Sequence, residues 1–193
     1  MKSVYIEDEK FEKRDFTTTP LAFGEYENCT FKDCEFANTD LREIRFVDCT
    51  FAGCNLTMAN LAGTVLRDIN FINCKMVGLH FENCSQFALS FNIDNCNLMH
   101  ASFFQTKIKS TIFKNAVLHD VDFTDCDLSA RVFDHCDLKG ATFDSTIIEK
   151  ADFRTAFNYS INPEVNRLKK AKFSIAGVAG LLDKYDIVID GSY

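Results

Sequence analysis

Large apolar residues recur along this chain at an interval of five. Stepping by five from Phe11 to Phe91, and again from Leu98 to Phe153, meets an apolar residue at every position except Gln86. That is 28 of 29 positions, whereas the 47% apolar composition alone would give about half. An interval of five fits neither the 3.6-residue period of a helix nor the alternation of a strand. The pattern therefore predicts a chain that turns at every repeat and winds around its own core.

The identity of these central residues also repeats, at an interval of twenty. Phenylalanine occupies one such series at Phe11, Phe31, Phe51 and Phe71, and leucine occupies another at Leu21, Leu41 and Leu61. Four repeats per turn explain this recurrence, because residues twenty apart then stack at the strand spacing of about 4.8 Å. The sequence predicts an all-β solenoid with four sides.

One interruption is expected in the coil. Two extra residues separate Phe91 from Leu98, which predicts an irregularity near residues 92–97. Phe87 is expected to swing inward in place of the polar Gln86.

The nine cysteines admit three interpretations: packing, a metal site or disulfides. Each cysteine lies two residues before a central position, where the other repeats often carry alanine or threonine. Positions two apart on an extended segment point the same way, so this slot faces inward and admits only a small side chain. Packing is favoured, because a spacing of five is not a zinc-binding pattern and nine is an odd number.

Composition narrows the function classes. The net charge of −7 disfavours direct binding of nucleic acid, which needs clustered Lys and Arg. No apolar run has the length of a membrane span, and the acidic start at Glu7 and Asp8 precedes any signal-peptide core. A cytoplasmic location without membrane contact is the expectation.

Catalytic and cofactor motifs are not found in the sequence. The histidines all fall at outward positions, and none is placed beside a nucleophile with an orienting partner. The glycine patterns that bind phosphates are absent as well. We therefore expect a protein that is not an enzyme and that has no cofactor and no metal. These histidines are His80, His100, His119 and His135.

The acidic charge is concentrated in the repeats. Residues 1–150 carry a net charge of −8, and residues 151–193 carry +1. Such a field suits a partner with a basic, DNA-binding surface, although solubility alone would also explain it. The densest acidic group, expected to form a partner-binding surface, is Asp120, Asp122, Asp125, Asp127, Asp134, Asp137 and Asp144.

Three regions are expected along the chain. Residues 1–10 form an N-terminal cap strand, 11–157 form the coil, and 158–193 form a C-terminal segment for capping and dimerisation. Within that segment, apolar spacing after Ser174 predicts a short helix with Ser174 as its N-cap, and 186–190 predicts a short strand.

The repeats resemble those of the pentapeptide-repeat proteins, whose consensus is close to A(D/N)LxX. The resemblance covers residues 11–157 and implies a right-handed quadrilateral β-helix. The repeats that match the consensus directly are Ala59-Asn60-Leu61-Ala62-Gly63, Ala151-Asp152-Phe153-Arg154-Thr155 and Cys126-Asp127-Leu128-Ser129-Ala130.

The C-terminal segment is similar to that of the Qnr-type quinolone-resistance members of the family. This resemblance implies a two-fold homodimer, an acidic rod that mimics DNA and binds DNA gyrase or topoisomerase IV. The chain lacks the two sizeable loops of the Gram-negative Qnr-type proteins, so an interaction module with an unrelated partner is the alternative. The expected dimer contacts are Ile175, Val178, Leu181, Leu182, Tyr185, Ile187 and Ile189.

Overall fold

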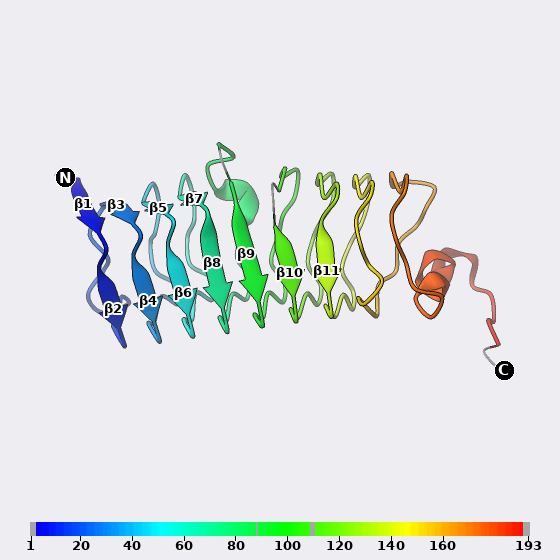
Figure 1. The fold of residues 1–193 in the computed structure, drawn as a ribbon, viewed down its shortest axis with the longest axis horizontal. Coiled ribbons are helices and arrows are strands. Elements are labelled where there is room, and N and C mark those ends of the chain that lie inside the picture. The colour runs from blue at the N-terminus through cyan, green and yellow to red at the C-terminus, as the bar shows by residue number, and fades with distance from the viewer. Residues whose placement is uncertain (1–2, 88, 109–110, 191–193) are drawn as a thin grey trace.

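The computed structural model describes residues 3–87, 89–108 and 111–190, and it shows a rod made of stacked turns of one coil (Figure 1). The N-terminus lies at one end of the rod and the C-terminus at the other. Every pairing between its strands is parallel. The solenoid class predicted from the repeat is confirmed.

Two parallel sheets run along the rod. The first contains β1 (Val4–Glu7), β3 (Gly24–Glu27), β5 (Arg45–Val47) and β7 (Val65–Arg67). The second contains β2 (Lys10–Glu12), β4 (Thr30–Lys32), β6 (Thr50–Ala52), β8 (Ile69–Ile72), β9 (Phe91–Asp94), β10 (Ile112–Lys114) and β11 (Val132–Asp134). Isolated parallel bridges join the turns on the other two sides, so the coil has four faces.

The corners of the coil are set by residues in the left-handed conformation. Asn28, Asp33 and Asp48 have φ angles of 50°, 52° and 51°, and each lies two positions after a central residue. Asn and Asp tolerate this region better than most residues, and glycine enters it freely, as Gly53 does with a φ of 66°. The repeated corner explains why the chain turns every five residues.

The central residues form columns in the interior. Phe113 pairs with Phe133 in register, and their rings stack with centroids 5.0 Å apart and an interplanar angle of 2°. Phe133 stacks equally on Phe153, at 4.6 Å and 10°. Each ring is thus covered by the rings of the neighbouring turns and is removed from water.

The nine cysteines are buried free thiols in the small inward slot, as the packing interpretation predicted. The thiol of Cys74 donates to the carbonyl of Phe51 in the preceding turn at 3.3 Å, and the hydroxyl of Thr64 donates to Leu41 in the same way at 2.8 Å. Burial raises the pKa of Cys126 and of Cys136 to about 12. The thiols are packing groups, and most of them donate a hydrogen bond to a backbone carbonyl, whereas Cys126 lies 3.2 Å from the Thr106 hydroxyl.

The irregularity lies earlier than the predicted 92–97. Phe71 pairs with Ile93, twenty-two residues later, whereas Ile93 and Phe113 resume the spacing of twenty. The amide of Ser85 still bonds Thr64 in the normal register. The shift is complete at Ser90, whose carbonyl accepts from Ile69. The two extra residues therefore lie between Ser85 and Ser90, in a loop that projects beside β9 (Figure 1).

The prediction that Phe87 turns inward is wrong. Phe87 is 85% exposed, whereas Leu89 is buried at 1% exposure. The chain bulges outward at the polar Gln86, and Leu89 then returns to the interior. This loop follows the short 3-10 helix η1 (Phe81–Asn83).

The coil continues past its expected end at 157. Asp152 bridges to Lys172, and the ring of Phe153 stacks on Phe173 at 5.4 Å. At the other end, Val4 pairs with Gly24, so the expected cap strand is the first strand of the coil itself.

The expected C-terminal helix is replaced by two short 3-10 helices, η2 (Val178–Leu181) and η3 (Asp183–Tyr185), and residues 186–190 form no strand. Two glycines explain the missing α-helix. A Cβ at Gly180 would lie 2.1 Å from the carbonyl oxygen of Tyr159, so this close approach requires glycine. Gly177 and Gly180 each lower helix propensity by about 1 kcal/mol relative to alanine.

We predict that Phe133→Ala lowers the free energy of unfolding by about 3–5 kcal/mol, because it opens a cavity between two stacked rings. Urea unfolding followed by circular dichroism measures the change. Val132→Ala is the matched control, since Val132 is the outward neighbour and is 36% exposed. Equal effects of the two substitutions would contradict the stacked-column account.

Candidate partner-binding surfaces

The outward residue just before a central residue has a structural task where it is Asp or Asn. Asp122 accepts a hydrogen bond from the backbone N–H of Thr124 at 2.8 Å, and Asp127 accepts from Ser129 at 3.0 Å. Asn60 makes the same bond to the N–H of Ala62. Side-chain oxygens of Asp and Asn thus satisfy the turn N–H, which is the physical reason for D/N in the repeat.

The seven predicted aspartates do not lie on one surface. Asp120, Asp122 and Asp125 follow one another along one side of a single turn. Asp144 lies on the same side one turn later, where its carbonyl accepts from the N–H of Asp125 at 2.9 Å. The structure therefore brings these four together.

The other three aspartates point from the three remaining faces. Asp127 lies in the column of Lys107 and Ile147, and Asp137 lies in the column that contains Val117. Asp134 belongs to β11. Residues close in sequence are separated because five residues of chain carry the backbone around one corner.

Sorting by face identifies carboxylates that sequence reasoning missed. Bridges from Asp40 to Asn60, and from His80 through Ser102 to Asp122, define the same side of the coil along its length. We call this side the acidic face. Its carboxylates are Asp40, Glu43, Glu82, Asp120, Asp122, Asp125 and Asp144.

Few cations oppose these carboxylates. Arg42 pairs with Asp40 at 2.7 Å, and no other Lys or Arg occupies an outward position of this face among the described turns from 38 to 145. His80 lies 2.8 Å from Glu82, and His100 lies 3.8 Å from Asp120. The six carboxylates of the face other than Asp40 form no ion pair with Lys or Arg within the described part of the chain.

A glycine gives Asp120 its place on this face. Asp120 lies at a corner with a φ of 54°, directly beside Gly140 of the next turn. A Cβ at Gly140 would lie 2.2 Å from the Asp120 Oδ1 atom. The missing side chain leaves the carboxylate room.

The three aspartates outside the acidic face are engaged in local contacts. Asp137 lies 2.7 Å from the His119 Nε2 atom and accepts from the side-chain amide of Asn158 at 2.8 Å. Desolvation alone would raise the pKa of Asp137, but the hydrogen bonds from His119 and Asn158 lower it. Asp127 lies 3.6 Å from the Lys107 Nζ atom.

Asp134 is held in the same way. The Thr155 hydroxyl donates to Asp134 at 3.0 Å, and the His135 ring lies 2.7 Å away. Both contacts lower the pKa of Asp134, the bond from Thr155 more strongly. The geometry thus divides the predicted set into four aspartates on the acidic face and three with local structural partners.

The C-terminal segment folds back over the last turn of the coil. Leu181 packs against the core, and the N–H of Ile161 donates to the carbonyl of Gly180 at 2.8 Å. The Tyr185 hydroxyl donates to Glu164 at 3.0 Å. Of the seven expected dimer contacts, Leu181 and Leu182 are therefore half-buried within the chain itself.

The remaining expected contacts are exposed. Ile175 is 95% exposed, and Val188, which sequence reasoning did not include, is 98% exposed. Such a run of exposed apolar side chains at one end of a rod is typical of an interaction surface. The exposed members are Ile175, Val178, Tyr185, Ile187, Val188 and Ile189.

Within 3–87, 89–108 and 111–190, no group of three or more His, Cys, Asp or Glu side chains has the arrangement of a metal site. None of the helices in that part of the chain is long and apolar enough to cross a membrane.

Comparison with known proteins identifies repeats and a fold. A family model for the pentapeptide repeat region matches residues 25–92 and 78–153. A trypsin-treated variant of QnrB1, a plasmid-mediated fluoroquinolone resistance protein, is 18% identical over 98% of this chain and 100% of its own, with a TM-score of 0.63. Full-length QnrB1 is 16% identical over 95% of this chain and 100% of its own, also with a TM-score of 0.63. A comparison with curated proteins gives no match.

We predict that Asp137 makes stability depend on pH. Its pKa is lower in the folded protein than the value of about 3.9 in an unfolded chain, so its contribution is present above that value and is lost as pH falls further. Asp137→Asn should lower the urea midpoint at pH 7, and the difference from the parent should shrink as pH falls below about 3.9. Asp144→Asn is the control, since Ser145 is the only partner of its side chain among the described residues. A difference that stays constant with pH would contradict this role.

Proposed function

Because the chain belongs to the pentapeptide-repeat family, we propose that it is a non-enzymatic cytoplasmic protein whose acidic face binds the basic DNA-binding groove of a type II topoisomerase. DNA gyrase and topoisomerase IV are the candidate partners, and the consequence would be altered topoisomerase activity or altered quinolone sensitivity. The observation that carries the proposal is the gathering of carboxylates on one face with Arg42 as their only Lys or Arg neighbour among the described turns.

The charge density of this face supports mimicry of DNA. Five stacking steps separate Asp40 from the turn of Asp144, which is about 24 Å at the strand spacing. Seven carboxylates and Arg42 leave a net charge of −6 over that length. That is roughly one charge per 4 Å, close to the spacing of about 3.4 Å along one DNA strand.

Carboxylates on successive turns of the face also repel one another, which costs stability. An arrangement that opposes stability in this way is more typical of a binding surface than of a structural one. A groove lined by Lys and Arg would relieve the repulsion on binding.

Two copies joined at their C-terminal ends would double the length of the rod. The support for this homodimer is the set of exposed apolar side chains between Ile175 and Ile189, which the described residues leave uncovered. A two-fold axis there would continue the acidic face from one copy into the next.

We predict that Ile175→Asp/Val188→Asp breaks the contact between two C-terminal ends and lowers the size of the assembly, because both side chains are almost fully exposed and contribute nothing to the fold of the single chain. Sedimentation velocity at tens of micromolar protein measures the change. Ile112→Asp is the control, since Ile112 is an exposed apolar residue on the coil. A parent protein that sediments as a monomer would refute the contact between the C-terminal segments of two copies.

We predict that Asp120→Asn/Asp122→Asn/Asp125→Asn weakens gyrase binding by about tenfold or more and flattens its salt dependence. Asparagine retains the turn hydrogen bond of Asp122, so the fold is preserved. The matched control removes the same charge from the other faces as Asp127→Asn/Asp134→Asn/Asp137→Asn. Binding and inhibition of supercoiling, with and without a quinolone, are the measurements.

Three outcomes are distinguishable. A loss confined to the first triple variant supports the acidic face. Equal losses of affinity in both variants would mean that binding depends on the net charge of the protein and that no single face makes the contact. No binding of the parent protein to gyrase or topoisomerase IV would leave the alternative, an interaction module whose acidic face serves an unrelated basic partner.

A further inference from the structure

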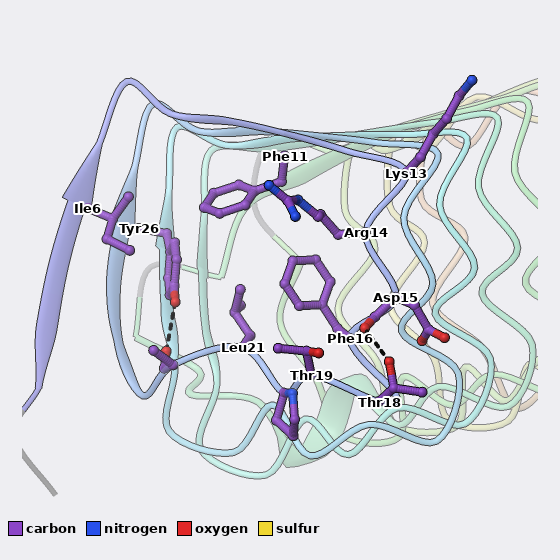
Figure 2. A pocket seen from close by; sticks show the side chains of 12 residues that line it. Ile6, Phe11, Lys13, Arg14, Asp15, Phe16, Thr18, Thr19, Leu21 and Tyr26 are labelled. Atoms are coloured by element: carbon purple, nitrogen blue, oxygen red, sulfur yellow. Dashed lines mark hydrogen bonds between the residues drawn. The ribbon is translucent and has the colours of Figure 1, made fainter.

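The N-terminal end of the coil is open. β1 and β2 are the edge strands of the two sheets, so their outer backbone groups have no neighbouring strand in the described chain. A cavity of about 460 Å³ opens over the interior of the first turn, lined by Ile6, Phe11 and Phe16 among others (Figure 2). The opposite end differs, because Leu181 and the rest of the C-terminal segment cover it.

Charged residues occupy the inward slots of this first turn. Glu9 and Arg14 hold the positions that Cys29 and Cys34 hold one turn later, as the bonds from Thr30 N–H to Glu9 and from Glu35 N–H to Arg14 show. Figure 2 shows the side chain of Arg14 pointing into the open cavity. A charge buried there without a partner would be costly, so these groups must face either water or opposite charges.

The signs of the charges in this turn form a two-fold pattern around Phe11. The sequence from Asp8 to Arg14 is acid, acid, base, Phe11, acid, base, base. Antiparallel pairing of two copies centred on Phe11 would place Lys10 opposite Glu12, Glu9 opposite Lys13, and Asp8 opposite Arg14. All six cross-pairs are of opposite charge, and such pairs stabilise a sheet.

We propose that this open end is a docking surface for the same end of a second copy, related by a two-fold axis through Phe11. The β2 strand of the second copy would pair antiparallel with β2, so that the outer backbone groups of both edge strands form hydrogen bonds. The same register continues around the turn: Phe11 meets Phe11, and Ile6 meets Phe16 of the second copy. The apolar linings of the two cavities therefore close on each other.

The charges also select this partner over others. Charged residues on an edge strand normally prevent pairing with unrelated strands. Here Glu9, Lys10, Glu12, Lys13 and Arg14 form no ion pair within the described residues, so they remain available. A copy that approaches in the antiparallel register finds opposite charges, whereas a parallel copy in register finds like charges.

A charge-swap experiment tests the proposal in the full chain. Every variant carries Ile175→Asp/Val188→Asp, which removes association through the C-terminal segment and leaves only association through the N-terminal end. One variant adds Lys10→Glu/Lys13→Glu, and a second adds Glu9→Lys/Glu12→Lys. Each alone places like charges opposite one another, so sedimentation should show self-association weakened by about tenfold or more. Mixed one to one, they should associate as tightly as the parent, because every altered pair is again opposite in sign.

Two controls complete the test. Lys75→Glu/Lys139→Glu makes the same charge change on the side of the coil and should leave association unchanged. A nitroxide on Lys32→Cys, one turn below Glu12, should give an intermolecular distance below about 30 Å, because the two labels are only a few strand spacings apart. The buried native thiols leave this one cysteine accessible.

The proposal is overturned if the parent of this series stays monomeric up to about 100 μM. It is equally overturned if either like-charged variant associates as tightly as that parent. The first result would mean that these charges act only to prevent pairing at the end of the coil, and the second that the association does not depend on them. Neither outcome bears on gyrase binding, which the acidic-face variants test separately.

Discussion

The stacking of one large apolar side chain per repeat is the interaction on which the rest of this molecule depends. A single turn cannot bury its own rings, since the two faces of the Phe133 ring are covered by Phe113 of one neighbouring turn and Phe153 of the other. Stability therefore arises between turns, and any break in register exposes two faces at once. Because the interior is filled by the central residues and the small slots beside them, chemistry that involves a partner has only the outward positions and the two ends.

On the outward positions, the same geometry that builds the coil sorts the charges. Opposite charges stack between turns on other faces, as in Arg45 with Glu25 at 3.1 Å and Lys114 with Asp94 at 3.3 Å. The acidic face instead keeps carboxylates with few partners. Exposed pairs contribute little to stability, so the pairing on other faces matters less than the lack of cations on this one. The asymmetry gives a rod of nearly constant cross-section one side that is distinctly acidic.

The fold could be predicted from the sequence because its period of five residues is short and recurs in every repeat. Which residue is central after the loop could not be predicted from the sequence. Phe91 and Ile93 are both apolar and both are buried, so either could be the central residue. The acidic surface was only partly predictable. Neighbouring aspartates such as Asp125 and Asp127 belong to different faces, and only the spacing of twenty, shifted at the loop, identifies their true neighbours. The C-terminal segment does not form the predicted α-helix because its glycines allow close packing against Tyr159. This contact cannot be predicted from the local sequence pattern.

The ends of the rod carry the remaining constraint. A coil held by pairing between successive turns must expose unpaired backbone at each end, and an exposed edge invites uncontrolled association. This chain meets that problem differently at its two ends. At the C-terminal end a glycine-rich segment folds back and covers the last turn, with exposed apolar groups left on its outer side. At the N-terminal end the cover is electrostatic, and its signs reverse symmetrically about Phe11. This charge pattern repels most strands but is complementary to a second copy in the antiparallel register. The same residues can therefore protect the edge from unrelated strands and select one partner.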